Sequence, residues 1–211
     1  MGKLSVFDYA KAKKIAEDLV EELTWVAASY AVLKESDKDD VKNKFIQTYA
    51  GHAYILIQRS LINDLLLTLL RMIDKDYKTS SFLNLKQMLE VDNAKENVKS
   101  NYKGALDAFD DRWDQLLLEL ENLEKELREE SIWKALIIHR GTYLAHRQQK
   151  PYKGSERIVR GDVDHLAVYF KDIIQLIEML FLESSGRPSA INTSYKKYAE
   201  EFWSSCLPVK E

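Results

Sequence analysis

Residues 102–127 read YKGALDAFDDRWDQLLLELENLEKEL, and the apolar positions in this stretch decide the fold class. The spacing between these positions alternates between four and three residues. They are Tyr102, Leu106, Phe109, Trp113, Leu116, Leu120, Leu123 and Leu127. This spacing predicts a long helix, capped at Asp92 or Asn93, with one apolar seam along its length. Such a seam packs lengthwise on an antiparallel neighbour, and we favour packing within the chain over a coiled coil between chains.

The composition of the whole chain also favours long helices. Only seven Gly and three Pro interrupt 211 residues, while 31% of residues are charged and 45% are hydrophobic. A chain of this length has enough apolar surface for one domain. The single cysteine, Cys206, has no internal disulfide partner, and no signal peptide is visible in residues 1–14. We therefore expect a cytoplasmic protein.

Apolar residues at helical spacing place the remaining elements. They predict helices over 8–34, 41–74, 82–90, 131–148, 163–184 and 190–205, with caps at Thr79–Ser81 and at Asp162. We expect an all-α, up-and-down bundle of about six to seven helices. The whole of 1–211 would form a single domain, with its core in 8–185 and the last helix packed on that core.

One part of the second predicted helix, residues 53–73, is apolar on most sides. Arg59, Asp64 and Arg71 interrupt it, and each would cost about 2.5–3.5 kcal/mol at the centre of a bilayer. The stretch is therefore expected to be the long central helix of a bundle and not a membrane span. Arg59, Asn63 and Asp64 would then need buried polar partners.

Charge is segregated along the chain although the net charge is only −3. Residues 106–130 contain ten acidic and three basic side chains, a net charge of −7. Residues 131–161 contain seven basic and one acidic side chain, a net charge of +6. A basic segment of this kind fits either an anionic partner such as RNA or the acidic helix that precedes it.

The predicted helix 131–148 has most of its ionisable side chains on one face. Projection at 100° per residue places six side chains in one arc of about 120°. They are His139, Arg140, Tyr143, His146, Arg147 and Lys150. An imidazole that moves protons near neutral pH, together with a guanidinium that stabilises a pentacoordinate phosphate, can cleave RNA without a metal.

A single copy of this helix would not complete such a site. Arg140 and His146 are separated by about 9 Å of helical rise and about 120° of rotation. A second copy related by a two-fold axis would bring the arginine of one subunit toward the histidine of the other. The pair therefore predicts a homodimer.

The histidines do not suggest a metal centre. His52, His139, His146 and His165 have no i,i+3 or i,i+4 spacing with one another, and no Glu-x-x-His pair is present. No glycine-rich phosphate loop is found either. We expect no metal and no cofactor.

The segment 140–146, RGTYLAH, resembles the R-x(4–6)-H signature of the HEPN superfamily. The stretch 64–76, DLLLTLLRMIDKD, followed by FLNLKQML over 82–89, is similar to the abortive-infection branch of that superfamily. The resemblance covers roughly residues 10–185. HEPN proteins are helical bundles that include RNase toxins, abortive-infection proteins and partners of nucleotidyltransferases.

The resemblance implies a metal-independent endoribonuclease of a toxin or phage-defence system. Arg140 and His146 would be catalytic, with His139 and Tyr143 in support, and Arg147, Lys150 and Lys153 would bind RNA. The family usually has Asn, Asp or His directly after the arginine, where this chain has Gly141. That departure favours an alternative, a non-catalytic module that binds RNA or a protein such as a nucleotidyltransferase antitoxin.

A second match to the signature occurs at Arg160–His165. This match is expected to straddle a loop and the start of a helix. A helix would then not present both side chains, so we prefer the match at Arg140–His146.

Overall fold

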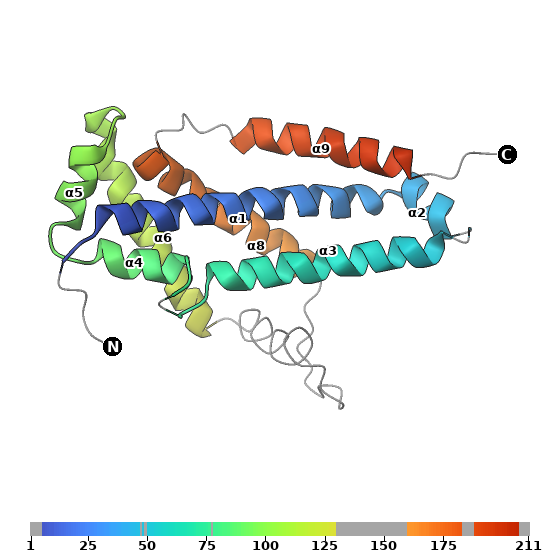
Figure 1. Ribbon diagram of the computed structural model, residues 1–211, viewed down its shortest axis with the longest axis horizontal. Helices are drawn as coiled ribbons and strands as arrows, with labels where there is room; N and C mark the ends of the chain where they lie inside the picture. The colour runs from blue at the N-terminus through green and yellow to red at the C-terminus, as the bar shows by residue number, and fades with distance from the viewer. Residues whose placement is uncertain are drawn as a thin grey trace.

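The computed structural model describes residues 6–46, 48, 50–76, 78–129, 160–182 and 188–206, with backbone alone for 129, 160–165 and 188–193. This part of the chain contains eight α-helices and no β-strand, which confirms the all-α prediction. The helices form an elongated bundle whose long axis follows α1 and α3 (Figure 1).

The central element of the bundle is α1 (Tyr9–Ser36). The Asp8 carboxylate accepts a hydrogen bond of 3.1 Å from the Lys11 backbone N–H and so caps the helix. In Figure 1, α1 lies between α9 and α3, and it also contacts α4 and α8. The helix predicted to be central, 41–74, instead lies on one side of α1.

The predicted helix 41–74 is two helices, α2 (Asp39–Ile46) and α3 (Gly51–Met72). The prediction of one helix was wrong because apolar periodicity continues across the break. At the break, the Thr48 hydroxyl donates to the Phe45 carbonyl at 2.9 Å and accepts from the Ala50 N–H at 3.2 Å. These local bonds compete with the helical ladder and turn the chain.

Only one side of α3 is buried. Residues in its C-terminal half enter the main core: Leu65, Leu66, Leu69, Leu70 and Met72. By contrast, Arg59, Asn63 and Asp64 are exposed, so the expectation of buried polar partners was wrong. The reason is that α3 packs against the bundle along one face and has solvent on the other.

By length and composition, α3 is also the one described helix apolar enough to cross a membrane, although only 33% of its most apolar window is buried within the bundle. Solvent-facing Leu and Ile side chains contribute to this composition. The core helices of soluble proteins commonly meet the same criterion.

Two short helices follow, α4 (Phe82–Leu89) and α5 (Ala94–Asn101). The predicted cap of α4 is confirmed, because the Ser81 hydroxyl accepts from the Asn84 N–H at 3.3 Å. Asn93 precedes α5 in the left-handed conformation, with φ of 68°, and makes no side-chain cap. The chain therefore turns sharply between the two helices.

The seam that decides the fold class is buried within the chain. Helix α6 (Phe109–Glu129) places Phe109, Trp113, Leu116, Leu120 and Leu123 in the main core. This burial confirms packing within one chain. The helix is shorter than predicted because Tyr102 is extended and only a 3₁₀ turn, Leu106–Ala108, precedes α6, which leaves Leu106 59% exposed.

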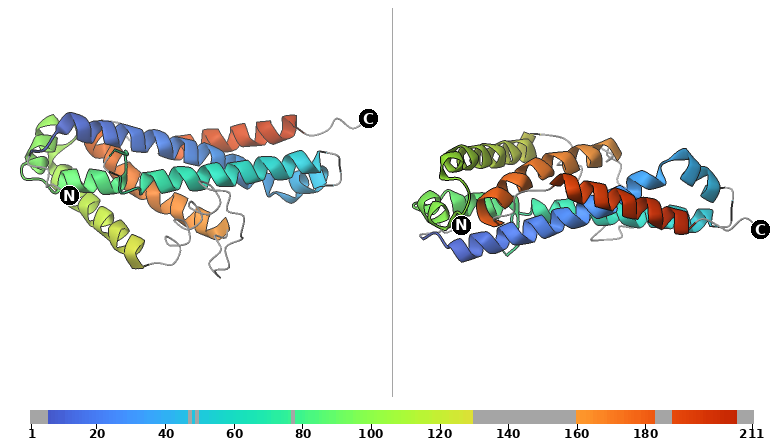
Figure 2. Two further views of the ribbon diagram at one scale, coloured as in Figure 1. Left: turned by 60° about the horizontal axis from the view of Figure 1, so that its bottom comes forward. Right: turned by 90° about the horizontal axis from the view of Figure 1, so that it is seen from above.

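The chain closes with α8 (Arg160–Ile177), a π-helical turn (Glu178–Leu182) and α9 (Pro188–Ser205). Because α8 begins at Arg160, Asp162 lies in its first turn and is not the predicted cap. A carboxylate in a first turn stabilises the helix dipole, and Gly161 is tolerated there. Figure 2 shows α8 crossing the bundle toward α6, and α9 running along α1.

Trp203 attaches the last helix, α9, to the bundle. Its indole N–H donates to the Val32 carbonyl at 2.8 Å. The ring packs in a second, smaller core with Val41, Phe45 and Tyr54. This small core fixes α2, α3 and α9 at the end of the bundle far from α6.

Candidate functional site

The residues predicted to be functional lie outside the described part of the chain. This holds for all seven of them: His139, Arg140, Tyr143, His146, Arg147, Lys150 and Lys153. Their roles therefore stay predictions. The structure does describe the two helices that flank them, α6 and α8.

The two flanking helix ends lie on the same side of the bundle. Figures 1 and 2 show the C-terminal end of α6 and the N-terminal end of α8 on the side of α1 where α3 and α4 lie. The N-terminal end of α8 lies beside the middle of α3, and these two helices are in contact. The last described residue before the predicted motif and the first one after it therefore both lie on the α3 side of α1.

Aromatic and aliphatic packing hold α8 rigidly in place. The Phe170 ring meets the Phe82 ring edge to face, with centroids 4.9 Å apart. Leu166, Ile173 and Ile177 are fully buried. Any group positioned by the start of α8 is thus supported by the main core and not by a surface loop.

The other flanking helix, α6, is acidic, and lysines of α4 and α5 neutralise part of its charge. The Asp110 carboxylate pairs with Lys95 at 3.1 Å and Lys99 at 2.7 Å, and hydrogen bonds from these two lysines, that of Lys99 first, lower its pKa. The Glu124 carboxylate lies 2.9 Å from the Lys86 ammonium, and its pKa is lowered by hydrogen bonds from Lys86 and then Arg128.

These ion pairs bear on whether the basic segment, residues 131–161, binds an anionic partner such as RNA or the acidic helix α6. Because residues of α4 and α5 already satisfy Asp110 and Glu124, these two carboxylates do not need the basic segment as a partner. The remaining acidic residues of α6 leave both interpretations of residues 131–161 open.

The second match to the family signature, Arg160–His165, does not straddle a loop. Both residues belong to α8, which begins at Arg160, so that prediction was wrong. Positions five residues apart differ by about 140° around a helix, and they point to different faces. The match is still a poor candidate for one site, but the reason is the spacing and not a loop.

One carboxylate that the sequence did not single out is Glu178, at the start of the π-helical turn. It lines a mainly apolar groove of about 190 Å³ between α1 and α8, with Val20, Leu23 and Tyr30 across from it. Burial raises the pKa of Glu178 above its ordinary value. Its only signal in the sequence is an acid among the buried neighbours Ile174, Ile177 and Phe181.

A second, polar groove of about 690 Å³ lies between α1 and α3. Asp18, Glu21, Glu22 and Asp64 supply carboxylates to its walls. The Arg71 guanidinium bridges the groove, donating to Glu22 at 2.9 Å and to the Thr68 hydroxyl at 3.1 Å. Sequence analysis could not place these residues together because they come from separate helices.

The described residues offer few groups of possible metal ligands. There, no three side chains of His, Cys, Asp or Glu come close enough to hold a metal ion. The exposed Cys206 lies at the end of α9.

The described residues define an all-helical bundle. The sequence model of AbiU2, a HEPN family, matches residues 9–202 of the chain. The chain therefore belongs to the AbiU2 family of HEPN proteins, which confirms the abortive-infection branch predicted from the sequence. No curated protein and no solved structure matches the chain.

Proposed function

We propose that this HEPN protein is a metal-independent endoribonuclease of a toxin or phage-defence system. The observation that carries the proposal is the segment RGTYLAH at 140–146 in a chain that belongs to a HEPN family. Membership of a HEPN family supports a functional interpretation of this match. The proposed site is shared by two copies of the chain.

The chemistry follows from the two residue types. The His146 imidazole accepts the proton of a ribose 2′-hydroxyl, and the oxygen attacks the adjacent phosphorus. The Arg140 guanidinium stabilises the negative charge that develops on the phosphoryl oxygens. The bond to the 5′ oxygen then breaks and this oxygen takes up a proton from water, leaving a 2′,3′-cyclic phosphate and a 5′-hydroxyl end, while His146 returns its proton to solvent.

Two copies are needed because of helix geometry. On the predicted helix 131–148, Arg140 and His146 diverge by about 120°, so one copy does not direct both at one phosphate. A two-fold axis pairs the arginine of each copy with the histidine of the other. His139 and Tyr143 lie on the same predicted face and would support these two residues.

RNA would be held by the basic residues that follow the motif. Arg147, Lys150 and Lys153 can each neutralise a backbone phosphate. Binding through such contacts falls steeply as the salt concentration rises, because the release of counterions from RNA gains less entropy in a more concentrated salt solution.

The test is RNA cleavage in EDTA. Wild-type protein is incubated with total RNA, and the 3′ ends are analysed for 2′,3′-cyclic phosphate. We expect His146→Ala and Arg140→Ala each to reduce cleavage by at least about 100-fold, which is typical for loss of a general base or of an oxyanion-stabilising cation.

Arg128→Ala is the matched control, because Arg128 is an exposed arginine on the neighbouring helix α6. It should cleave RNA as the wild type does. Absence of cleavage by the wild type, or equal cleavage by His146→Ala, would refute the proposed enzyme.

A non-catalytic module that binds RNA or a nucleotidyltransferase antitoxin is the second candidate. Gly141 favours it, since the family usually has a polar residue at that position. Glycine within a helix also costs about 1 kcal/mol relative to alanine, which suggests that close packing has been preferred to chemistry there.

RNA retention distinguishes the two candidates. If the module binds without cutting, RNA binding should survive His146→Ala and should weaken as salt is raised. Loss of intact RNA in the wild-type sample, prevented by His146→Ala, would instead favour the enzyme.

A further inference from the structure

The outward side of α3 is a stripe of exposed residues along the whole helix. We call it the α3 face. It consists of His52, Leu56, Arg59, Ser60, Asn63, Asp64, Leu67 and Arg71. Two leucines of the stripe are solvent-exposed, Leu56 at 62% and Leu67 at 36%.

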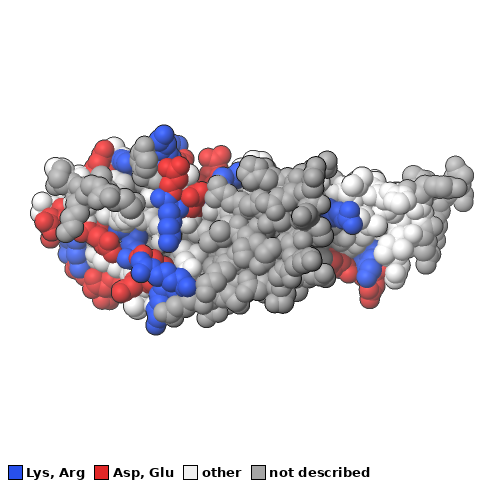
Figure 3. Space-filling model, turned by 90° about the horizontal axis from the view of Figure 1, so that it is seen from below, with Lys and Arg blue, Asp and Glu red and all other residues white. Residues whose placement is uncertain are grey.

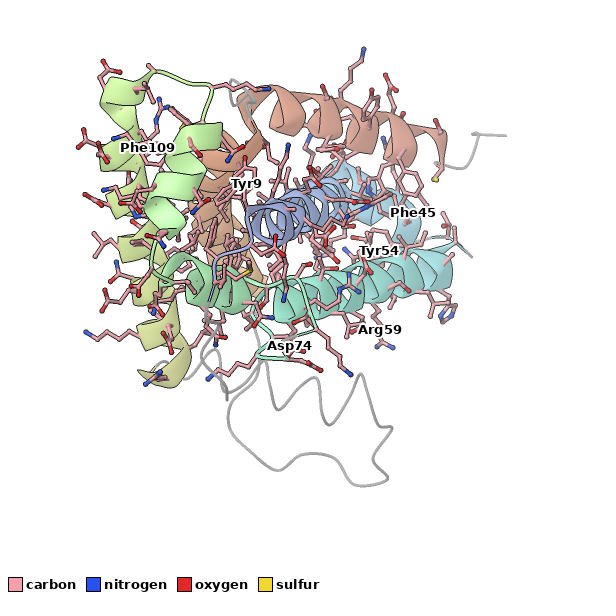
Figure 4. The ribbon with its side chains drawn as sticks, turned by 60° about the vertical axis from the view of Figure 1, so that its left-hand side comes forward. Tyr9, Phe45, Tyr54, Arg59, Asp74 and Phe109 are labelled. Carbon is pink, nitrogen blue, oxygen red and sulfur yellow. The ribbon has the colours of Figure 1, made fainter. Side chains whose placement is uncertain are left out.

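The opposite side of α3 does the packing. Leu61 and Ile62 pack against the main core, and Tyr54 enters the small core. Figure 4 shows Arg59 pointing away from the bundle, whereas Tyr54 on the same helix points inward near Phe45. The α3 face is thus not required for the fold of one chain.

Arg71 of this face pairs with Glu22 of the same copy, but the two charged residues in the middle of the face do not have such a partner among the described residues. In the described part of the chain, neither Arg59 nor Asp64 takes part in an ion pair. Figure 3 shows charged side chains crowded at the end of the molecule that carries α4 to α6, and mostly uncharged described surface at the other end.

The α3 face is complementary to itself. Consider two antiparallel copies of α3 related by a two-fold axis that passes between positions 61 and 62. Residues equidistant from that point then face each other. Leu56 lies opposite Leu67 of the second copy, Arg59 opposite Asp64, and Ser60 opposite Asn63.

Other registers lose this match. Moving the axis two residues toward the N-terminus sets Leu56 opposite Asn63, and moving it two residues toward the C-terminus sets Leu56 opposite Arg71. Both shifts also separate Arg59 from Asp64. Charge pairing across an interface fixes register and partner, while the apolar contacts supply most of the affinity.

We propose that the α3 face binds a second copy of this chain through antiparallel α3–α3 pairing about that axis. This inference rests on the proposed function, which needs two copies, and it names the surface through which they meet. The interface would contain two leucine contacts and two ion pairs, with one of each on either side of the axis and the ion pairs nearer to it.

This arrangement also suits a catalytic site that two copies of the chain share. The N-terminal end of α8 lies beside the middle of α3, close to where the proposed axis passes (Figures 1 and 2). In the proposed dimer, the two α8 helices would begin on either side of the axis, each at Arg160. Two copies of the RNase motif precede these two entry points in the sequence.

The first test is molar mass by light scattering after size-exclusion chromatography, without lipid or detergent. At micromolar concentration the wild type should have twice the chain mass of 24.5 kDa. Leu56→Asp should weaken dimerisation by at least about tenfold. Leu118→Asp is the matched control, because Leu118 on α6 is 55% exposed and lies outside the α3 face, so this variant should stay dimeric.

The second test is a charge swap. Arg59→Asp and Asp64→Arg should each weaken the dimer, because each creates like charges across the axis. The double variant R59D/D64R should restore it, because the opposite charges then face each other with signs exchanged. Circular dichroism should show wild-type helicity for all of these variants, since both positions are exposed.

Three results would overturn the proposal: a monomeric wild type, a fully dimeric Leu56→Asp, or a double variant no more dimeric than the single ones. A monomer whose sedimentation with phosphatidylcholine and phosphatidylglycerol vesicles is lost in Leu56→Asp would identify the face as a membrane surface instead. Failure of the interface and failure of the enzyme are distinguishable. A dimer that cuts no RNA refutes only the enzyme, and RNA cleavage by a dimer insensitive to Leu56→Asp refutes only this interface.

Discussion

At the scale of single residues, Glu178 differs from the other carboxylates with a shifted pKa in the described chain. Asp18, Asp110 and Glu124 have lowered pKa values, whereas that of Glu178 is raised. The cause is desolvation in an apolar groove. An ionised carboxylate there opposes folding, because its charge is less well hydrated than in the unfolded chain.

Replacing Glu178 with glutamine should therefore stabilise the protein at pH 7. We expect the melting temperature to rise by roughly 1–3 °C. Below the ordinary pKa of 4.5 the carboxyl is protonated in both states, so the gain should vanish there and grow as the pH rises through the folded-state pKa. Calorimetry at pH 7 and at a pH below 4.5 tests this expectation. Glu17→Gln on the exposed side of α1 should show no such pH-dependent gain.

At the scale of elements, the junction between α5 and α6 determines how the apolar seam begins. Tyr102 ends α5 in an extended conformation, and its ring packs against Phe109 with centroids 5.1 Å apart. The Arg112 guanidinium donates a hydrogen bond to the Tyr102 hydroxyl. A Cβ atom added to Gly104 would overlap the Tyr102 ring. The junction therefore needs a residue without a side chain at 104.

Gly104→Ala should destabilise the protein by about 1–2 kcal/mol, because the buried tyrosine ring must move to make room. Urea unfolding measures this change. The effect should shrink when Tyr102 is already alanine, since the ring that is displaced is then absent. An equal cost of Gly104→Ala in both backgrounds would mean that the ring is not the cause. Ala105→Ser, at an exposed neighbouring position, is the control.

At the scale of the whole molecule, three carboxylates connect separate elements through their charge. Asp18 of α1 accepts from the Ser80 hydroxyl at 2.6 Å, Glu124 of α6 pairs with Lys86 of α4, and Asp110 of α6 pairs with lysines of α5. Burial by itself would raise the pKa of Asp18, but hydrogen bonds from Lys14 and Ser80 lower it overall. All three groups favour the ionised form in the folded state.

The bundle should therefore lose stability in acid. A carboxylate whose folded pKa is lowered stabilises the protein above its ordinary pKa, and this contribution is lost as the pH falls through the folded value. Thermal unfolding should show decreasing stability as the pH falls below the ordinary values of 4.5 for Glu124 and 3.8 for the two aspartates. When the pH falls through this range, the Glu124→Gln variant should lose less stability than the Glu121→Gln variant. Glu121 is an exposed neighbour on the same helix. Equal losses would show that the pair with Lys86 does not contribute.

The bundle has two separate hydrophobic cores. The main core extends from Phe7 to Phe181, while Trp203 closes a small core with Phe45 and Tyr54 at the far end. Between these cores, α3 is covered by the bundle on one side only. This one-sided packing leaves exposed the α3 face, which is the surface proposed to bind a second copy.

The sequence alone determined the helical class, the seam from Phe109 to Leu123, the Ser81 cap and the HEPN family. All of these are local in the chain. An apolar repeat near 3.6 residues, a capping hydroxyl and a short motif are each complete within a few turns of helix. The roles of Arg140 and His146 also come from the sequence, and they stay a prediction to be tested on RNA.

Only the tertiary structure decided where helices end and which faces they bury. Apolar spacing alone continued through Thr48 and through Tyr102, where local hydrogen bonding and ring packing turn the chain. The sequence pattern predicts that Arg59, Asn63 and Asp64 are buried, because their neighbours along the chain are apolar. Exposure depends on which distant segments cover a helix, and the periodicity of that helix contains no information about its partners.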